Sequence, residues 1–212
     1  MDIFLDLDGT LTDNRIGIMT SVEEALAQLG EPVPDRQALL SWIGPPLKAN
    51  FVDHLGSETK ADQAVALYRE RYRDIGLFEN EVYDGVPQMM DDLITLGSRL
   101  WLATSKPHVY AQQIVAHFGL DTRLQGVFGS EMDGQNSDKT ELLTHAIGET
   151  SATERMMLGD RRFDMQAARA TGCIAIGALW GFGSANELTE AGADYLADTP
   201  ASVAKQVKET RT

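Results

Sequence analysis

The chain has 212 residues, of which 43% are hydrophobic, and a formal net charge of −14. This length fits one large domain, or one domain with a modest insertion, and supplies enough apolar side chains for a buried core. The acidic balance, without any run of basic residues, argues against nucleic-acid polymers and anionic membranes as partners.

The sequence gives little indication of a membrane span, a secretory signal or a disulfide. No apolar stretch approaches the roughly 20 residues of a membrane span, and the N-terminus MDIFLDLDGT carries aspartates inside its apolar run, unlike a secretory signal. The single cysteine, Cys173, excludes an internal disulfide and lies in an apolar run, as a small buried side chain would. We therefore expect a cytoplasmic protein.

Short apolar runs alternate with helical patterns along most of the chain, which predicts βαβ units and a parallel sheet. The predicted strands cover residues 3–7, 99–103, 126–128, 155–158, 174–179 and 194–196. The predicted helices cover residues 86–96, 107–118, 139–147 and 162–170, with a last one from residue 200. Proline near the start of several helices and glycine just past the end support these boundaries.

The segment from about residue 15 to 80 breaks this alternation, because it contains helical patterns and no convincing strand. Gly30 is the expected stop of its first helix, and Asp35 the expected N-cap of a short second one. We predict an α-helical insertion over 15–83 and an α/β core formed by 1–14 and 84–212. The alternative is one continuous fold with a long helical crossover.

Two aspartates follow the first predicted strand. Strand alternation would place Asp6 and Asp8 on the same side, and two carboxylates at the carboxyl end of a parallel strand repel each other. A divalent cation such as Mg²⁺, which prefers oxygen ligands, would relieve this repulsion. The alternative is a strand followed by a simple Asp-Gly turn.

A second acidic pair follows the strand at 155–158. Asp160 and Asp164 are one helical turn apart, so both can face one point near the start of the next helix. The alternative is helix capping, since an aspartate at a helix N-terminus is favourable without any ligand.

Polar residues at two further helix starts suit phosphate binding. Thr104 and Ser105 precede a helix expected to begin at Pro107, and a hydroxyl beside free backbone N–H groups can hold a phosphate. Lys139 opens another helix, where a cation is unfavourable unless it meets an anion elsewhere. The alternatives are an ordinary hydroxyl cap and a solvated lysine. Gly181–Gly183 is interpreted as a tight loop before a capping box at Ser184.

In this order, Asp-x-Asp-Gly-Thr, a strand ending in Thr104, the lone Lys139 and Gly-Asp-x-x-x-Asp resemble the four-motif signature of the haloacid dehalogenase superfamily of phosphohydrolases. The resemblance covers the whole chain. It implies a Rossmann-like α/β core with an α-helical type-1 cap inserted after the first motif. The presence of Asp8 disfavours the dehalogenase branch itself.

Finer landmarks at 43–47, 76–80, 104–107, 129–134 and 180–184 resemble the phosphoglycolate phosphatase-like group, and within it the branch described as 5′-nucleotidases. The chain departs from many relatives at Thr140, where they carry proline after the lysine.

The resemblance also implies a role for each motif residue. Asp6 would be the nucleophile and Asp8 the general acid and base. The phosphate oxygens would be held by Thr104, Ser105 and Lys139. Mg²⁺ would be bound by Asp6, the backbone carbonyl of Asp8, and Asp160. Asp164 would support Lys139 or the metal from the second coordination sphere, and Thr10 would fix the loop by a hydroxyl hydrogen bond.

We expect a Mg²⁺-dependent phosphatase acting on a small phosphorylated metabolite. Lys48, after the Gly-Pro-Pro loop of the helical segment, is a candidate substrate contact. A sugar phosphomutase shares all four motifs, and a catalytically silent interaction protein is the alternative from another class. The sequence predicts no oligomeric state.

Overall fold

The computed structural model describes residues 1–44, 46–132 and 135–210. Three residues of the landmark segments, Pro45, Asp133 and Gly134, lie outside this range. The chain divides into two compact units. One combines Met1–Thr12 with Val82–Thr212, and the other is Asp13–Glu81.

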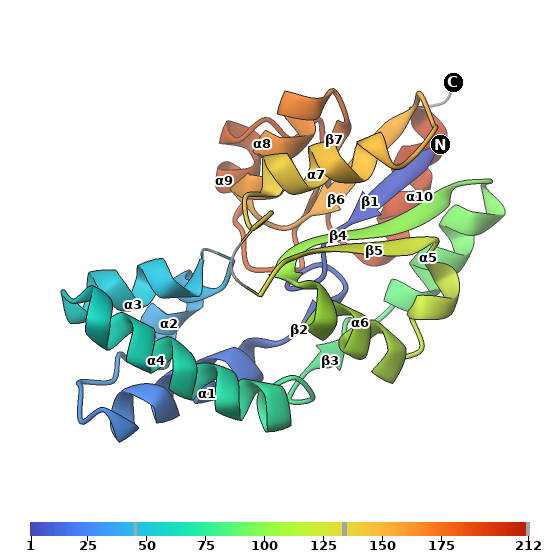
Figure 1. Ribbon diagram of the computed structural model, residues 1–212. Helices are drawn as coiled ribbons and strands as arrows, with labels where there is room; N and C mark the ends of the chain where they lie inside the picture. The colour runs from blue at the N-terminus through green and yellow to red at the C-terminus, as the bar shows by residue number, and fades with distance from the viewer. Residues whose placement is uncertain (45, 133–134, 211–212) are drawn as a thin grey trace. The chain divides into compact units, whose positions relative to one another are not determined.

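A six-stranded parallel sheet forms the centre of the first unit, in the order β5-β4-β1-β6-β7-β8 (Figure 1). All four residues of the central strand β1 are buried, as expected for a parallel strand covered on both faces. The α/β fold class is confirmed. The strands are β1 Asp2–Leu5, β4 Arg99–Pro107, β5 Gly126–Ser130, β6 Arg155–Gly159, β7 Ile174–Ala178 and β8 Tyr195–Ala197.

Helices cover both faces of this sheet (Figure 1). One face carries α5 Val86–Thr95, α6 His108–His117 and α10 Pro200–Glu209; the other carries α7 Lys139–Gly148, α8 Arg162–Thr171 and α9 Ala185–Glu190. Right-handed crossovers require this division, because the chain leaves β1 toward one sheet edge and later returns toward the other. Under α7 and α8, a core cluster joins Leu143 and Met165 to Phe4 and Met157 of the sheet.

The strand order places the point where the chain reverses direction at β1, which lies between β4 and β6. Leu5 is in register with Leu102 of β4 and with Leu158 of β6. The residues that follow these positions therefore meet at the carboxyl edge of the sheet. Ligands of open α/β folds bind at such switch points.

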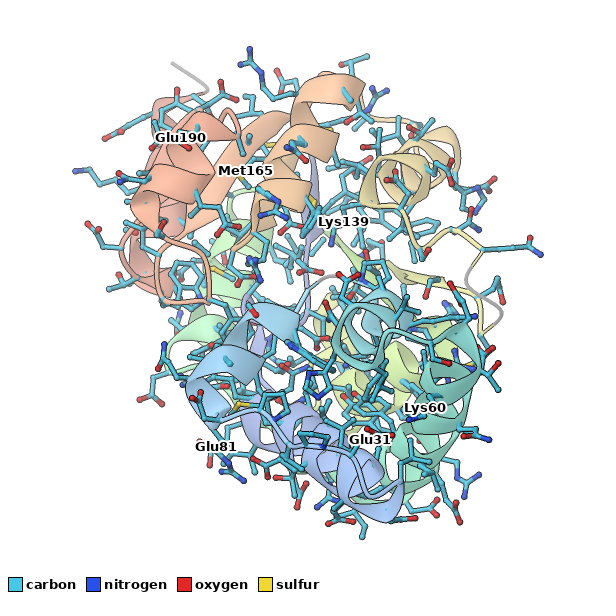
Figure 2. All side chains as sticks on the ribbon, turned by 90° about the vertical axis from the view of Figure 1, so that its left-hand side faces the viewer. Glu31, Lys60, Glu81, Lys139, Met165 and Glu190 are labelled. Carbon is cyan, nitrogen blue, oxygen red and sulfur yellow. The ribbon has the colours of Figure 1, made fainter. Side chains whose placement is uncertain are left out.

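The second unit is helical. It contains α1 Arg15–Gln28, α2 Arg36–Leu39, α3 Leu47–Leu55 and α4 Glu58–Arg71, which runs into a π-helical turn at Tyr72–Gly76. The start of α1 crosses that turn closely, since a Cβ on Gly17 would lie 2.1 Å from the carbonyl oxygen of Gly76. An ion pair between Glu31 and Lys60, both labelled in Figure 2, ties α4 to the segment after α1.

Local chemistry accounts for several helix boundaries. Asp35 accepts a hydrogen bond from the backbone N–H of Ala38 at 2.8 Å, so the expected N-cap of α2 is confirmed. The first helix of this unit begins directly after Asn14 and ends two residues before Gly30. No helix among the described residues is both long and apolar enough to cross a membrane.

Several boundaries differ from the sequence predictions, most clearly around β1 and β4. β1 ends at Leu5 instead of Leu7, and β4 continues to Pro107, so the following helix begins at His108. Two short strands, β2 Thr12–Asp13 and β3 Glu81–Val82, pair with each other and were not predicted. Two residues are too few to establish an alternating pattern.

Candidate active site

The loop after β1 carries the first acidic motif. β1 ends at Leu5, so Asp6 and Asp8 both lie in the loop that follows it. The expectation that strand alternation places them on one side was therefore wrong. The carbonyl oxygen of Leu7 accepts hydrogen bonds from the N–H groups of Thr10, Leu11 and Thr12, which curls the loop tightly. This loop directs the Asp6 carboxylate to a buried partner.

That partner is Lys139, labelled in Figure 2, whose side chain is only 5% exposed. Its Nζ lies 2.7 Å from Oδ1 of Asp6 and 2.9 Å from Oδ1 of Asp164. The alternative of a solvated surface lysine is therefore wrong. The lysine meets two anions, as its unfavourable position at a helix start required.

The start of α7 is stabilised by the preceding residue. Oδ1 of Asp138 accepts hydrogen bonds from the N–H groups of Thr140 and Glu141, at 2.9 and 3.0 Å. A proline at position 140 would have no N–H to donate. The departure at Thr140 therefore adds a capping hydrogen bond to the helix that carries Lys139.

The second acidic pair divides its tasks. Asp164 caps α8, since its Oδ2 accepts a hydrogen bond from the N–H of Arg161 at 3.1 Å, so the capping interpretation holds for this residue beside its contact with Lys139. Asp160 precedes the helix and does not cap it. Its Oδ1 accepts from the hydroxyl of Thr10 at 3.1 Å, and its Oδ2 from the N–H of Phe182 at 2.8 Å.

Negative charge exceeds positive charge at this point. One carboxylate oxygen from each of Asp6, Asp160 and Asp164 lies within 4.8 Å of the others, and all three residues are buried beside Lys139. Burial, with the charges of Asp164 and Asp6, raises the pKa of Asp160 well above its usual range. Burial also raises the pKa of Asp164 to about 6, although Lys139 opposes this shift.

The lysine responds in the opposite direction. Burial alone would lower the pKa of Lys139, but the charges of Asp164 and Asp6 outweigh burial and raise it. The lysine is therefore charged at neutral pH. One cation against three carboxylates leaves room for a divalent metal, and the all-oxygen donor set suits a hard ion such as Mg²⁺. The hydrogen-bond donors to Asp160 are uncharged, a hydroxyl and a backbone N–H, whereas Asp164 is bound by the charged Lys139, so Asp160 is the stronger ligand candidate of the two.

Lys106 is a site residue to which the sequence analysis gave no role. Its Nζ lies 2.8 Å from Oδ2 of Asp8, and its side chain is 6% exposed. Its backbone N–H donates to the buried hydroxyl of Thr104 at 3.2 Å. The sequence signal for a site role was the position of Lys106 in Thr-Ser-Lys-Pro, between a predicted strand and a proline. A residue just after a parallel strand lies at the carboxyl edge of the sheet, where ligands bind.

The expected phosphate cradle at a helix start needs correction. Thr104 and Ser105 belong to β4, and the next helix begins three residues after Ser105, at His108. The carbonyl oxygen of Ser105 accepts a hydrogen bond from the hydroxyl of Ser130 at 2.8 Å. A phosphate bound by this strand would therefore be held by the backbone N–H groups and hydroxyls of the strand, and not by the N–H groups at the start of the helix.

Lys48 lies in the helical unit, near the start of α3. Its Nζ is 3.1 Å from Glu58 and 2.7 Å from Asp62, and its side chain is half exposed. The structure thus gives this lysine two acidic partners within its own unit. A role in substrate binding stays a prediction.

The loop after β7 also reaches the site. The indole Nε1 of Trp180 donates to the carbonyl oxygen of Thr10 at 2.9 Å, and Phe182 binds Asp160 as described. Ser184 accepts from the N–H of Glu187, as the expected capping box requires, but the Glu187 side chain binds Nε of Arg161 at 2.9 Å. The tight loop is therefore part of the acidic site's support.

Comparison with known proteins agrees with this geometry. The family model of haloacid dehalogenase-like hydrolases matches residues 3–178. A 5′-nucleotidase from Pseudomonas aeruginosa is 46% identical over 190 residues, covering 88% of this chain and 86% of the relative. A phosphoglycolate phosphatase from Colwellia psychrerythraea is 24% identical, covering 93% and 92%.

Two further relatives extend the comparison. The tyrosine-protein kinase PtkA of Mycobacterium tuberculosis is 36% identical over 186 residues, which cover 87% of this chain and 64% of the kinase. The crystal structure of a predicted phosphatase from Clostridium acetobutylicum superposes with a TM-score of 0.92, at 36% identity and 98% coverage of both chains. With its family model, its relatives and its parallel sheet in agreement, the chain belongs to the haloacid dehalogenase-like hydrolases and is a phosphatase of the phosphoglycolate phosphatase-like group.

Proposed function

We propose that this phosphatase hydrolyses small phosphate monoesters through a covalent aspartyl-phosphate on Asp6, with Mg²⁺ as cofactor. The observation that carries the proposal is the position of Asp6. It follows the central strand, is bound by the buried Lys139, and lies against Asp160 and Asp164. A carboxylate held in this way has a fixed direction of attack, which is what positioning contributes to phosphoryl transfer.

The first step is attack by a carboxylate oxygen of Asp6 on phosphorus. The bond between phosphorus and the ester oxygen breaks, and the leaving oxygen takes a proton from Asp8. Lys139, Thr104 and Ser105 would bind the non-bridging oxygens. Mg²⁺, held by Asp6, Asp160 and the carbonyl of Asp8, would supply positive charge against the transferring phosphoryl group.

The second step consumes water. Asp8 takes a proton from a water molecule while the oxygen of that water attacks phosphorus. The bond between phosphorus and Asp6 then breaks and inorganic phosphate is released. The carboxylate of Asp8 needs a defined orientation to serve both steps, and the ion pair with Lys106 supports that orientation.

The test is phosphate release from p-nitrophenyl phosphate by wild type and Asp6→Asn, with and without Mg²⁺ after dialysis against EDTA. The matched control is Asp74→Asn, an exposed carboxylate of the helical unit that pairs with Arg73. We expect Asp6→Asn alone to abolish turnover, and hydroxylamine to trap an acyl phosphate at Asp6 of the wild type, detected by peptide mass. Turnover by Asp6→Asn within tenfold of wild type would remove Asp6 as nucleophile.

For the substrate, we propose nucleoside 5′-monophosphates ahead of 2-phosphoglycolate. The support is the 5′-nucleotidase relative, which is 46% identical, against 24% for the phosphoglycolate phosphatase. A phosphate-release panel of nucleotides, phosphoglycolate and sugar phosphates tests the order by kcat/KM. A value for phosphoglycolate above that of every nucleotide would reverse it.

The same panel separates hydrolysis from transfer, which the tyrosine-protein kinase relative and the phosphomutase alternative raise. Hydrolysis releases one inorganic phosphate for each ester consumed. A shortfall, balanced by a phosphorylated protein or an isomeric sugar phosphate, would indicate that water is replaced by another acceptor.

We further propose that the helical unit Asp13–Glu81 is the cap that contacts the rest of the substrate, with Lys48 as one contact. The motif residues address only the phosphoryl group, so discrimination among esters needs other side chains. Lys48→Met should raise KM for the preferred ester and leave KM for p-nitrophenyl phosphate near wild type. An unchanged KM for the preferred ester would exclude this lysine.

A further inference from the structure

The loop after β7 and the loop after β1 are linked through Asp160 by a closed ring of hydrogen bonds. The hydroxyl of Thr10 donates to Oδ1 of Asp160, the N–H of Phe182 donates to Oδ2, and Nε1 of Trp180 donates back to the carbonyl oxygen of Thr10. The three distances are 3.1, 2.8 and 2.9 Å. Every member lies in the sheet-bearing unit.

Glycines make this ring possible. A Cβ on Gly181 would lie 2.3 Å from Cβ of Asp160 and 2.3 Å from the carbonyl oxygen of Gly9, and a Cβ on Gly183 would lie 2.0 Å from the carbonyl oxygen of Asp160. Real side chains do not approach so closely, so the loop reaches the carboxylate only because both neighbours of Phe182 lack a Cβ. The close approach aims the Phe182 N–H at Asp160.

The ring fixes a carboxylate that is otherwise disfavoured. Asp160 is fully buried, and the neighbouring charges of Asp6 and Asp164 oppose its ionised form. Hydrogen bonds to both oxygens favour that form and fix its orientation. A ligand held in place before the metal arrives binds it more tightly than one that must be ordered.

We propose that Trp180 is a positioning residue for the metal site: its indole anchors Thr10 and closes the ring that holds Asp160 in ligand geometry. This inference rests on the proposed function, in which Asp160 is a Mg²⁺ ligand. In this role Trp180 acts through its hydrogen bond to Thr10.

The test measures metal binding without substrate. Mn²⁺ is titrated into metal-free protein and free Mn²⁺ is followed by electron paramagnetic resonance, for wild type and Trp180→Phe. Trp42→Phe, in the helical unit where the indole packs edge-on against Phe51, is the matched control. We expect Trp180→Phe to weaken Mn²⁺ binding about threefold to tenfold, the effect of one hydrogen bond, and the control to leave it unchanged.

The ring also predicts the effect of substitutions at Thr10. Thr10→Val should weaken Mn²⁺ binding and Thr10→Ser should not, and the Trp180→Phe/Thr10→Val double variant should lose less than the product of the two single losses. These Thr10 variants test the ring even if Trp180→Phe fails to fold.

Each result has a defined consequence. A Trp180→Phe protein that binds Mn²⁺ within twofold of wild type, or independent effects in the double variant, would overturn the positioning role, whatever happens to its melting temperature. A wild type that fails to bind Mn²⁺ at millimolar concentration would overturn the proposed metal function as well.

Discussion

Lys139→Met should destabilise the metal-free protein strongly and in a pH-dependent way. The substitution removes the buried cation that bonds Asp6 at 2.7 Å and Asp164 at 2.9 Å, and leaves both carboxylates beside Asp160. Breaking a buried pair by removing one partner costs about 3–5 kcal/mol. Asp164, whose pKa is already raised to about 6, can take up a proton, so we expect the lower end, about 3 kcal/mol.

In a chain of 212 residues, about 3 kcal/mol lowers the melting temperature by roughly 6–12 °C. The assay is thermal unfolding in EDTA at pH 7.5 and pH 5.5, with Lys60→Met as control, because Lys60 forms an exposed pair with Glu31. Without the lysine the carboxylates bind protons more readily, so the deficit should shrink at pH 5.5. A deficit under 2 °C at pH 7.5, or one that does not shrink on acidification, would refute this account of the site.

Four further outcomes follow from the same charges and contacts. The pKa of Asp160 is raised in the folded protein, so the metal-free protein should lose stability as pH rises from the ordinary aspartate pKa of 3.8 toward the folded value. In thermal unfolding, Asp160→Asn should flatten that loss and abolish stabilisation by Mg²⁺. Burial alone would raise the pKa of Asp2, but hydrogen bonds from Arg99 lower it, so the stability difference between wild type and Asp2→Asn should be constant above pH 4 and fade as pH falls below it in denaturant titrations. Lys106→Met should lower kcat more than it raises KM in steady-state assays, because it releases Asp8 and leaves the residues proposed to bind phosphate in place. Inorganic phosphate should bind measurably by calorimetry only when Mg²⁺ is present, and equal affinity in EDTA would contradict the charge balance of the site.

The sheet was predictable from sequence because its strands are apolar and punctuated by proline and glycine. The run IFL and the run MML needed no tertiary information to be identified as buried strands, and they lie side by side as β1 and β6. The two-residue strands β2 and β3 carry no such pattern, and only their mutual pairing defines them. Strand ends were also misplaced, since Leu7 is apolar but belongs to a turn whose carbonyl accepts three N–H groups.

Of the motif residues, Asp6, Asp160, Asp164 and Lys139 lie together in the structure, and their catalytic roles stay predictions. What the sequence could not supply is which side chain bonds which. The pairing of Lys106 with Asp8, and the route from Trp180 through Thr10 to Asp160, join positions up to 170 residues apart. Spacing along the chain carries no information about such contacts.

An acidic chain can still bind an anion, because the ion pairs within the site, and not the net charge of the chain, set the charge that the anion meets. Lys106 binds Asp8, and Asp6 and Asp164 share Lys139, so within the described part of the chain these two lysines face four carboxylates, Asp160 included. A phosphate dianion approaching this site would be repelled, whereas a divalent ion cancels the remaining charge. With the proposed metal bound, Lys139 would offer positive charge to an incoming phosphoryl group. The net charge of −14 therefore does not oppose phosphatase function, because the charges within the site, and not those of the whole chain, act on a bound anion.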